Sequence, residues 1–430
     1  MTTLKQDCTD SMIRLIQTQT AAAVGCTEPA AVAFASALAA EALGEKPETI
    51  DVGVSRNILK NAMGVGIPGT GMVGLPVASA LGALAGDPKA ELAVLHAATD
   101  ADADRAKRFV GEGRVTVHLC TDVPKLYIEV RVFANKNTAC AVIAGAHTHV
   151  MRIEKNGQVI RGGKDGSAEA LSEEEIPLAL EDIDAFVRSV EGEKLQFLSQ
   201  TVDMNLSISQ DGLNGDYGLA VGKMLWKRME SGEIARTEEQ EAIAVTCAAA
   251  DARMAGSTNP VMTSCGSGNQ GLTATLPVIS VCRSRGLDQE TMYRALAYSL
   301  LVTIYVKRRI GKLSALCACS VGASIGTACA LTWLGGGTPE QIRYSIDNVI
   351  ADVSGVICDG AKPGCSLKIA SGISSAFMAS MLALSDMHAT AYDGIVGKTQ
   401  EKSIENLGIL STDGMSVTDH VILDMLCSKN

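Results

Sequence analysis

The sequence predicts an α+β fold in which a mixed α/β N-terminal part, with an antiparallel sheet, precedes a largely α-helical C-terminal part. Short alternating apolar segments gather between residues 50 and 160, as in strands. Longer Ala-rich segments of helical length follow from about residue 195. A chain of 430 residues also exceeds one ordinary core. We therefore expect a mixed α+β domain at 1–195 and a mainly helical domain at 196–430.

The first part of the chain combines helices with strands. Residues 3–22 have helical apolar spacing, and Pro29 marks the start of the next helix. An Asn-Gly pair at 156–157 lies at the centre of the segment 150–160 and predicts a β-hairpin. Residues 163–192 are charged and helical, which is typical of a surface segment. Further strands are expected at 50–54, 115–119, 126–133 and 139–144.

The second part is expected to be helical at 238–250, 288–304, 313–333 and 373–385. The stretch from 313 to 339 carries no charge and is long enough to cross a bilayer. Its side chains are mostly Ala, Gly, Ser, Cys and Thr, which gain little in lipid, and the mean hydropathy of the chain is only +0.18. A buried core helix is favoured, and a membrane transporter is the competing interpretation.

Composition excludes several classes of function. Lys plus Arg number 37 against 48 for Asp plus Glu, and this net charge of −11 repels phosphate backbones. Aromatic residues are only 3%, which disfavours base stacking. The 13 cysteines are too few for a disulfide scaffold, and the start MTTLKQDCTD has no signal-peptide pattern. We expect a cytoplasmic protein whose thiols are free for metal binding or catalysis.

Two charge-free segments are rich in Gly and Pro: GVGIPGTGMVGLP at 64–76 and GSTNPVMTSCGSGNQG at 256–271. Their composition does not suit simple core helices, and their backbone groups need hydrogen-bond partners. A small polar ligand or close packing between domains would each supply them.

Seven cysteines are the most informative thiols: Cys26, Cys265, Cys282, Cys317, Cys319, Cys358 and Cys365. Cys358 and Cys365 lie in GVICDGAKPGCSLK at 355–368, where Gly360 and Pro363 prevent a continuous helix, so a loop can bring both thiolates to one centre. Cys317 and Cys319 would diverge by about 200° on a helix, so only one could face a shared site. The spacing of Cys317 and Cys319 is neither that of a zinc ribbon nor that of a ferredoxin.

Four motifs carry a resemblance to a known family: GCTEP at 25–29, GIPGTGMVG at 66–74, GKLSALC at 311–317 and GVICDGAKPGCSLK at 355–368. They resemble the L-cysteine desulfidase family of bacteria and archaea, which is related to the alpha part of iron–sulfur L-serine dehydratases. The likeness covers essentially the whole chain. It implies a carbon–sulfur lyase with a [4Fe-4S] cluster that converts L-cysteine to pyruvate, hydrogen sulfide and ammonia without pyridoxal phosphate.

The resemblance also implies where the cluster binds. It makes Cys317, Cys358 and Cys365 the metal ligands of the C-terminal, catalytic domain, with Cys319 as the alternative to Cys317. The spacing from Cys358 to Cys365 is shorter than in the dehydratases. Cys26 matches a cysteine characteristic of the desulfidases, as either a fourth ligand or a substrate contact.

β-Elimination from an amino acid requires assistance to the leaving group, removal of the α-proton and a hold on the carboxylate. Three protein thiolates leave one iron of a cubane free to act as a Lewis acid. The candidates for catalytic proton transfer are Cys26, Glu28 and Lys368. For the substrate, we expect a backbone N–H nest at Ser267, Gly268 and Asn269, assisted by Asn61.

Two other interpretations remain open at this point. One is an iron–sulfur L-serine dehydratase-type lyase, because thiol and hydroxyl groups leave from the same carbon. The other is a non-catalytic metal-binding or sulfur-sensing protein that uses the same thiols. The expected partner is a small amino-acid substrate, with no nucleic acid and no membrane, and the apolar helical half suggests a homodimer.

Overall fold

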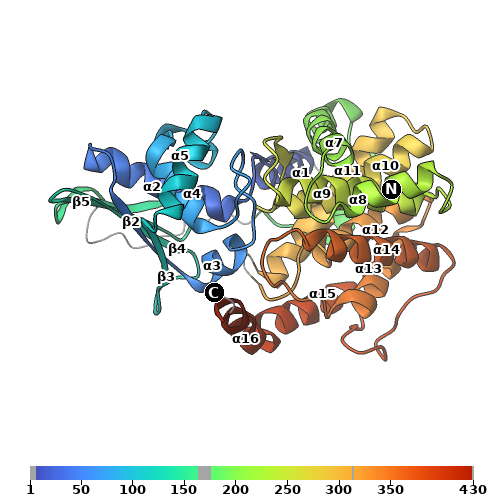
Figure 1. Cartoon of the computed structure of the whole chain (residues 1–430). Helices are drawn as coiled ribbons and strands as arrows, with labels where there is room; N and C mark the ends of the chain where they lie inside the picture. The colour runs from blue at the N-terminus through green and yellow to red at the C-terminus, as the bar shows by residue number, and fades with distance from the viewer. Residues whose placement is uncertain (1–5, 163–175, 312–313, 429–430) are drawn as a thin grey trace.

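The computed structural model describes residues 6–162, 176–311 and 314–428 and shows a helix-covered sheet beside a larger group of helices (Figure 1). The sheet has the strand order β3-β2-β4-β5-β6-β7. Its strands are β2 (Thr49–Val54), β3 (Val115–Leu119), β4 (Tyr127–Ala134), β5 (Asn137–Ala144), β6 (Val150–Lys155) and β7 (Gln158–Arg161). The α+β class and the predicted strands are confirmed.

One feature of the sheet differs from the prediction. All neighbouring strands pair antiparallel except β2 and β3, which are parallel. The long connection between them, which contains three α-helices, permits a parallel return. The hairpin β6–β7 turns at Asn156 and Gly157, whose φ angles of 49° and 79° are those of a type I′ turn. The hairpin prediction is therefore confirmed.

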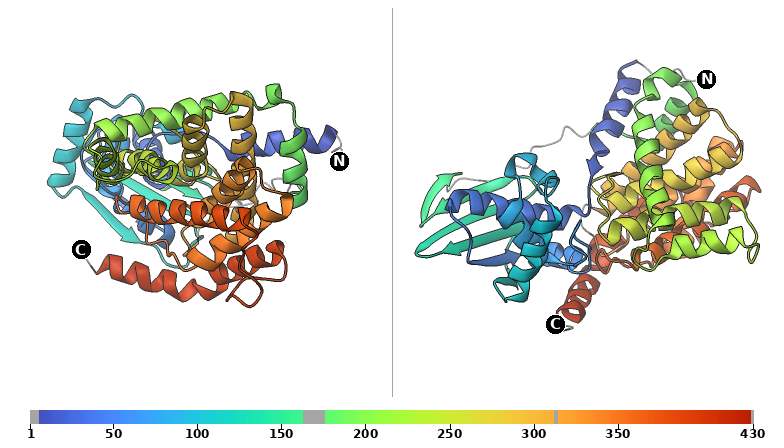
Figure 2. Two further views of the ribbon diagram at one scale, coloured as in Figure 1. Left: turned by 90° about the vertical axis from the view of Figure 1, so that its right-hand side faces the viewer. Right: turned by 45° about the horizontal axis from the view of Figure 1, so that its top comes forward.

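Helices α2 (Thr27–Leu43), α4 (Leu75–Ala85) and α5 (Asp100–Gly111) lie over one face of the sheet, as both views in Figure 2 show. Ile128, Val130 and Val132 of β4 point into this layer and are fully buried. A Cβ atom on Gly82 of α4 would lie 2.3 Å from the carbonyl oxygen of Ala33 in α2, so glycine permits the two helices to touch. The short helix α3 (Arg56–Ala62) follows the end of β2.

The other helices form a second apolar core. It includes α1 (Gln6–Gln19), whose Met12, Leu15 and Ile16 are buried in it, whereas the first core draws on residues 31–153. The division of domains at residue 195 remains a prediction. The later helices are α6 (Leu180–Ser189), α7 (Leu198–Asn214), α8 (Val221–Glu230), α9 (Glu238–Met254), α10 (Gly268–Ser284), α11 (Gln289–Ile310), α12 (Gly322–Leu334), α13 (Pro339–Val353), α14 (Cys365–Leu384), α15 (Gln400–Ile409) and α16 (Ser416–Cys427).

The predicted helices at 238–250, 288–304 and 373–385 are confirmed as α9, α11 and α14, but the one at 313–333 is shorter. Residues 314–321 form a turn, and α12 contains only 13 residues. The reason is that Leu316 pairs as a β-bridge with Ile357 instead of continuing a helix. Of the predicted charged segment, residues 163–175 lie outside the described residues.

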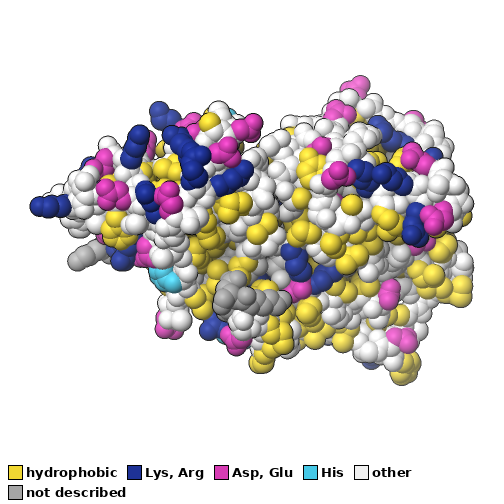
Figure 3. All heavy atoms as spheres, viewed as in Figure 1, with side chains coloured by type: hydrophobic (Ala, Val, Ile, Leu, Met, Phe, Trp, Pro, Cys, Tyr) yellow, Lys and Arg dark blue, Asp and Glu magenta, His cyan; other side chains and the backbone are white. Residues whose placement is uncertain are grey.

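The stretch at 313–339 therefore does not form a helix long enough to span a bilayer in its described part. Within the described ranges, one other helix, α14, is long and apolar enough to do so by composition, and 44% of its apolar window is buried in the fold. Its Leu367, Met378 and Met381 are each just over half exposed. Figure 3 shows hydrophobic side chains spread over the surface of the helical part, among polar and charged ones.

Candidate functional site

Cys317 and Cys358 come from segments 40 residues apart that pair side by side. The Cys317 N–H donates to the Val356 carbonyl oxygen at 2.9 Å, and the Cys358 N–H donates to the Ala315 carbonyl oxygen at 2.6 Å. These two bonds flank the bridge between Leu316 and Ile357. The pairing fixes the two cysteines as neighbours.

Cys365 reaches the same place because it is the first residue of α14, directly after the loop. Its Sγ lies 3.7 Å from the Gly360 carbonyl oxygen, which curls the loop back toward Cys358. Gly360 has a φ of 89°, and a Cβ atom there would lie 2.1 Å from the carbonyl oxygen of Lys60 in α3. The loop therefore packs directly against α3. Any residue other than glycine at position 360 would prevent this close contact.

These thiols are close enough to influence one another's acidity. Burial raises the pKa of Cys365 to about 11, and the neighbouring Cys317 and Cys358 raise it too. Burial also raises the pKa of Cys358, with a contribution from Cys317 that Lys60 and Lys368 oppose. A raised pKa favours the protonated thiol, so binding of a metal group to these cysteines would release protons.

Cys319 also faces this site. Because residues 314–321 form a turn, Cys317 and Cys319 do not diverge as they would on a helix. A hydrogen bond with Cys319, followed by burial, raises the pKa of Cys317 well above its usual range. The Sγ of Cys319 also lies 3.6 Å from the Oγ of Ser267, the N-cap residue of α10. Both cysteines of this pair therefore remain available as ligands.

Cys26 approaches from the N-terminal side. The short strands β1 (Ala22–Ala23) and β8 (Val261–Met262) pair antiparallel and align the start of α2 with the start of α10. Cys26 is the N-cap residue of α2 and packs with Met254, at the end of α9, and with Cys365. Burial raises the pKa of Cys26 to about 11, while Arg253 lowers it.

The predicted substrate residues lie along the same junction. Gly268 and Asn269 are the first two residues of α10, and the Asn269 Oδ1 accepts a hydrogen bond from the Arg253 guanidinium at 3.0 Å. On the other side, the Asn61 Nδ2 donates to the Glu28 Oε1 at 3.1 Å. Asn61 and Glu28 thus form one polar pair, and the start of α10 forms a second polar group.

The Lys368 ammonium group is fixed by a hydrogen bond and an ion pair. Its Nζ donates to the Ile357 carbonyl oxygen at 2.7 Å and forms an ion pair with Asp359, which also pairs with Lys362. Lys60, almost fully buried, forms an ion pair with Asp419 of α16. These contacts tie the cysteine loop to α14 and join α3 to α16.

The Gly-rich loops obtain backbone partners from packing between segments. The Gly66 N–H donates to the Met254 carbonyl oxygen at 2.9 Å, and a Cβ atom on Gly66 would lie 2.4 Å from the carbonyl carbon of Ala255. In the second loop, the Thr263 N–H donates to the Ala21 carbonyl oxygen at 2.8 Å. Of the two explanations that the sequence left open, packing accounts for these groups.

The thiol set suits an iron–sulfur cluster better than a single ion. Across residues 6–162, 176–311 and 314–428, no three His, Cys, Asp or Glu side chains are grouped so that they could hold a metal ion. A [4Fe-4S] cluster binds each thiolate to a different iron, so its ligands need not meet at one point. Three neighbouring thiols with cationic side chains close by fit such a group in chemistry, because thiolates are soft ligands.

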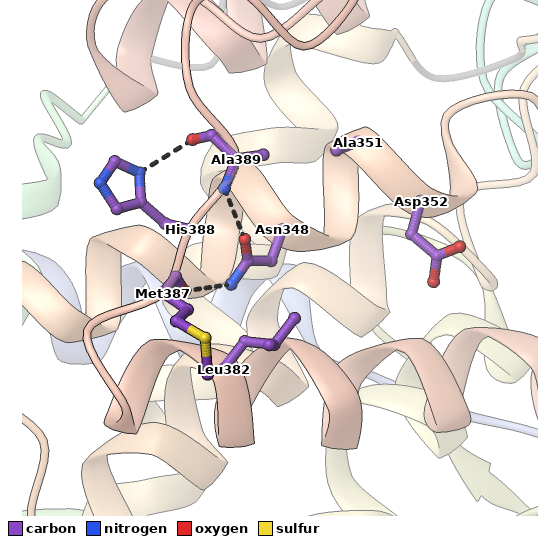
Figure 4. Close-up of a pocket in the computed structure, with 7 residues that line it drawn as sticks. All are labelled: Asn348, Ala351, Asp352, Leu382, Met387, His388 and Ala389. Atoms are coloured by element: carbon purple, nitrogen blue, oxygen red, sulfur yellow. Dashed lines mark hydrogen bonds between the residues drawn. The ribbon is translucent and has the colours of Figure 1, made fainter.

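A pocket of about 410 Å³ lies elsewhere, between α13 and α14 (Figure 4). Its Asn348 side chain bonds the backbone of Met387 and Ala389. The lining contains no thiol and none of the predicted site residues. We therefore place the candidate site at the cysteine junction and not in this pocket.

Two buried cations to which the sequence analysis assigned no role lie at the junction, Arg253 and Lys307. Burial lowers the pKa of Lys307, and the nearby Cys265 and Cys319 partly oppose this effect. Both residues lie in the last turn of a helix with an apolar or Ala-rich stretch before it. A charged residue at the end of such a stretch is the sequence feature that could have identified them.

The chain is similar to known proteins over most of its length. Residues 89–424 match the family model described as the serine dehydratase alpha chain. A UPF0597 protein of Bacteroides fragilis is 42% identical over 97% of this chain and 98% of its own length. A UPF0597 protein of Porphyromonas gingivalis is 41% identical, also over 97% and 98%. The UPF0597 protein YhaM of Salmonella gallinarum is 41% identical over 97% of each chain.

Proposed function

Because this chain belongs to the serine dehydratase alpha chain family, a family of amino-acid lyases that generally carry iron–sulfur clusters, we propose that it is an L-cysteine desulfidase. The proposed reaction is β-elimination of L-cysteine to pyruvate, hydrogen sulfide and ammonia. What supports the proposal is that Cys317 and Cys358 lie on paired segments and that both raise the pKa of Cys365. The cytoplasmic location and the homodimer remain predictions.

We propose that these three thiols hold a [4Fe-4S] cluster, with Cys319 as the alternative to Cys317. When bound, such a cluster supplies an iron with a free coordination position that acts as a Lewis acid toward the leaving group. Support comes from the shared electrostatic environment of the thiols and from the cationic Lys60 and Lys307 beside them. Positive side chains stabilise the negative charge of thiolate-ligated iron.

The chain supplies the proton transfer. We propose Glu28 as the base that takes the α-proton, because it lies at the start of α2 and Asn61 orients its carboxylate. Cys26 is the alternative at the same helix start, and it would first have to lose its thiol proton, since burial raises its pKa to about 11. The electrons of the Cα–H bond form the Cα=Cβ double bond, and the Cβ–S bond breaks with its electron pair leaving on sulfur. Lys368 is the alternative base, and it would have to leave its ion pair with Asp359 to accept a proton.

The remaining steps need only water. The sulfur leaves as hydrosulfide, and the aminoacrylate tautomerises to an imine that water hydrolyses to pyruvate and ammonia. We propose that the start of α10, at Ser267, Gly268 and Asn269, binds the substrate carboxylate throughout. The N-terminal end of a helix favours a negative charge because its first N–H groups have no intrahelical acceptor.

L-Serine is the second candidate substrate, and the name of the matching family favours it. Its hydroxyl group leaves from the same carbon, so the same residues would serve. The test is an anaerobic assay of the reconstituted protein with each amino acid, which measures sulfide from L-cysteine and pyruvate from both. We expect a higher kcat/KM for L-cysteine. Pyruvate formation from L-serine alone would assign the dehydratase reaction instead.

A further inference from the structure

Arg253 is a buried cation at the candidate site. Only 4% of the residue is exposed, and it lies at the end of α9, against the first residue of α10. One guanidinium nitrogen, NH1, donates to the Asn269 Oδ1 at 3.0 Å, and NH2 donates to the Gly25 carbonyl oxygen at 2.9 Å. The third, Nε, is buried and has no acceptor within the described residues. Both acceptors are neutral, and in these ranges no carboxylate forms an ion pair with Arg253. The Cys26 thiol also interacts with the guanidinium, which lowers the pKa of Cys26 against the effect of burial.

The surroundings of this guanidinium are themselves electropositive. Gly25 directly precedes Cys26, the N-cap of α2, so Arg253 meets the beginning of α2 as well as that of α10. In α10 the first intrahelical bond is donated by Gly271, so the N–H groups of Gly268 and Asn269 precede it. Two helix N-termini and a buried cation thus converge, although each of them favours an anion and disfavours a positive charge.

The sequence provides room for this arrangement. A Cβ atom on Gly268 would lie 2.2 Å from the Arg253 Nε, so glycine is needed for the guanidinium to lie against the helix end. A buried charge without an opposite charge is costly, so an anion bound beside it would stabilise the fold. Such an anion would have to be small, because Cys26 lies beside the guanidinium.

We propose that Arg253, with the N-terminal ends of α2 and α10, forms the binding site for the α-carboxylate of the substrate. This inference rests on the proposed function and deepens it, since it names the group by which the substrate is recognised. The planar guanidinium can offer paired N–H donors to a carboxylate, which an ammonium cannot do with the same geometry. The site therefore requires a free carboxylate and discriminates against thiols that lack one.

Two small thiols test the proposal on the unaltered protein. 3-Mercaptopropionate keeps the carboxylate of cysteine and lacks its amino group, whereas cysteamine keeps the amino group and lacks the carboxylate. Their dissociation constants are measured anaerobically by calorimetry on the reconstituted protein. We expect 3-mercaptopropionate to bind at least roughly tenfold more tightly, as for one charge-assisted hydrogen bond gained. Equal affinities, or tighter binding of cysteamine, would overturn the proposal.

Variants of Arg253 test whether this residue is responsible for binding the carboxylate. Arg253→Lys and Arg253→Met are expected to weaken 3-mercaptopropionate binding by roughly 10-fold and 100-fold, with little effect on cysteamine. The matched control is Arg283→Met, an exposed arginine at the opposite end of α10, which should bind as the wild type does. Folding of each variant is checked by its thermal unfolding curve. If folded Arg253→Lys and Arg253→Met both keep wild-type affinity, the assignment is wrong.

Binding and turnover separate the two proposals. A protein that binds 3-mercaptopropionate through Arg253 but releases neither sulfide from L-cysteine nor pyruvate would contradict the proposed function and leave the carboxylate site standing. If the protein turns over L-cysteine while Arg253→Met keeps the wild-type KM and the wild-type affinity, the proposed function stands. The assignment of Arg253 to the carboxylate site is then wrong.

Discussion

Replacing Gly268 by Ala tests how tightly the junction is built. Alanine is the better helix former by about 1 kcal/mol, so an isolated helix would gain stability from this change. Here the new Cβ atom would lie 2.2 Å from the Nε and 2.5 Å from the Cζ of Arg253, so the guanidinium must move. It then loses its bonds to Asn269 and Gly25, each worth about 1.5–3 kcal/mol because the donor is charged.

The two effects have opposite signs, and their sizes decide the outcome. Losing both bonds costs about 3–6 kcal/mol, and subtracting the gain of about 1 kcal/mol leaves a net loss of about 2–5 kcal/mol. The assay is urea unfolding followed by circular dichroism. The matched control is Gly322→Ala, at the first residue of α12, where the nearest atom to the new Cβ lies 3.5 Å away. That variant should be as stable as the wild type or slightly more so.

A Gly268→Ala protein that equals or exceeds the wild type in stability would refute this reasoning. It would mean that Arg253 can move without loss, and therefore that its bonds do not hold the start of α10 to the turn before α2. A Gly322→Ala protein that is destabilised as strongly as Gly268→Ala would refute it too, because the loss would then follow from any side chain at a helix start.

Three further predictions concern the acid–base behaviour and the geometry of the fold. Burial raises the pKa of Asp347, so the folded state holds this proton more tightly than the unfolded chain, and ionisation costs the folded state stability as the pH rises above about 4. Relative to the wild type, Asp347→Asn should therefore become more stable between about pH 4 and pH 7 in urea unfolding, and a constant difference would contradict the assignment. Gly360→Ala should lose about 1–3 kcal/mol in the same assay, since its φ is 89° and its Cβ would meet the Lys60 carbonyl oxygen; an unchanged midpoint would show that the loop can move away from α3. Cys319→Ala should retain its iron after reconstitution whereas Cys317→Ala should not, and the opposite result would exchange the two ligands.

Local signals in the sequence were sufficient for much of the fold. The Asn156–Gly157 turn and the alternating strands around it are short-range features, and the structure contains them where expected. The parallel pairing of β2 with β3 was missed because it depends on where α4 and α5 pack, which is a contact between distant segments. The same holds for residues 314–321, which leave helical geometry to pair with residues 356–358.

In the candidate site, too, the residues recognisable from the sequence differ from those whose role depends on contacts between distant segments. The thiols could be chosen from the sequence because cysteine chemistry limits the candidates, and the Gly and Pro residues after Cys358 indicated a loop. Arg253 could not be assigned in this way. Its importance comes from the convergence of α2, α9 and α10, which no spacing along the chain expresses.

The most direct test of the account is the iron and sulfide content of the anaerobically reconstituted protein, together with its visible absorbance. We predict about four irons per wild-type chain, and loss of the cluster absorbance in Cys317→Ala, Cys358→Ala and Cys365→Ala. Cys120→Ala, a half-buried thiol after strand β3, is the matched control and should keep the wild-type iron. A colourless wild-type protein, or full absorbance in Cys358→Ala or Cys365→Ala, would contradict the claim that these thiols hold a cluster between the two parts of the chain.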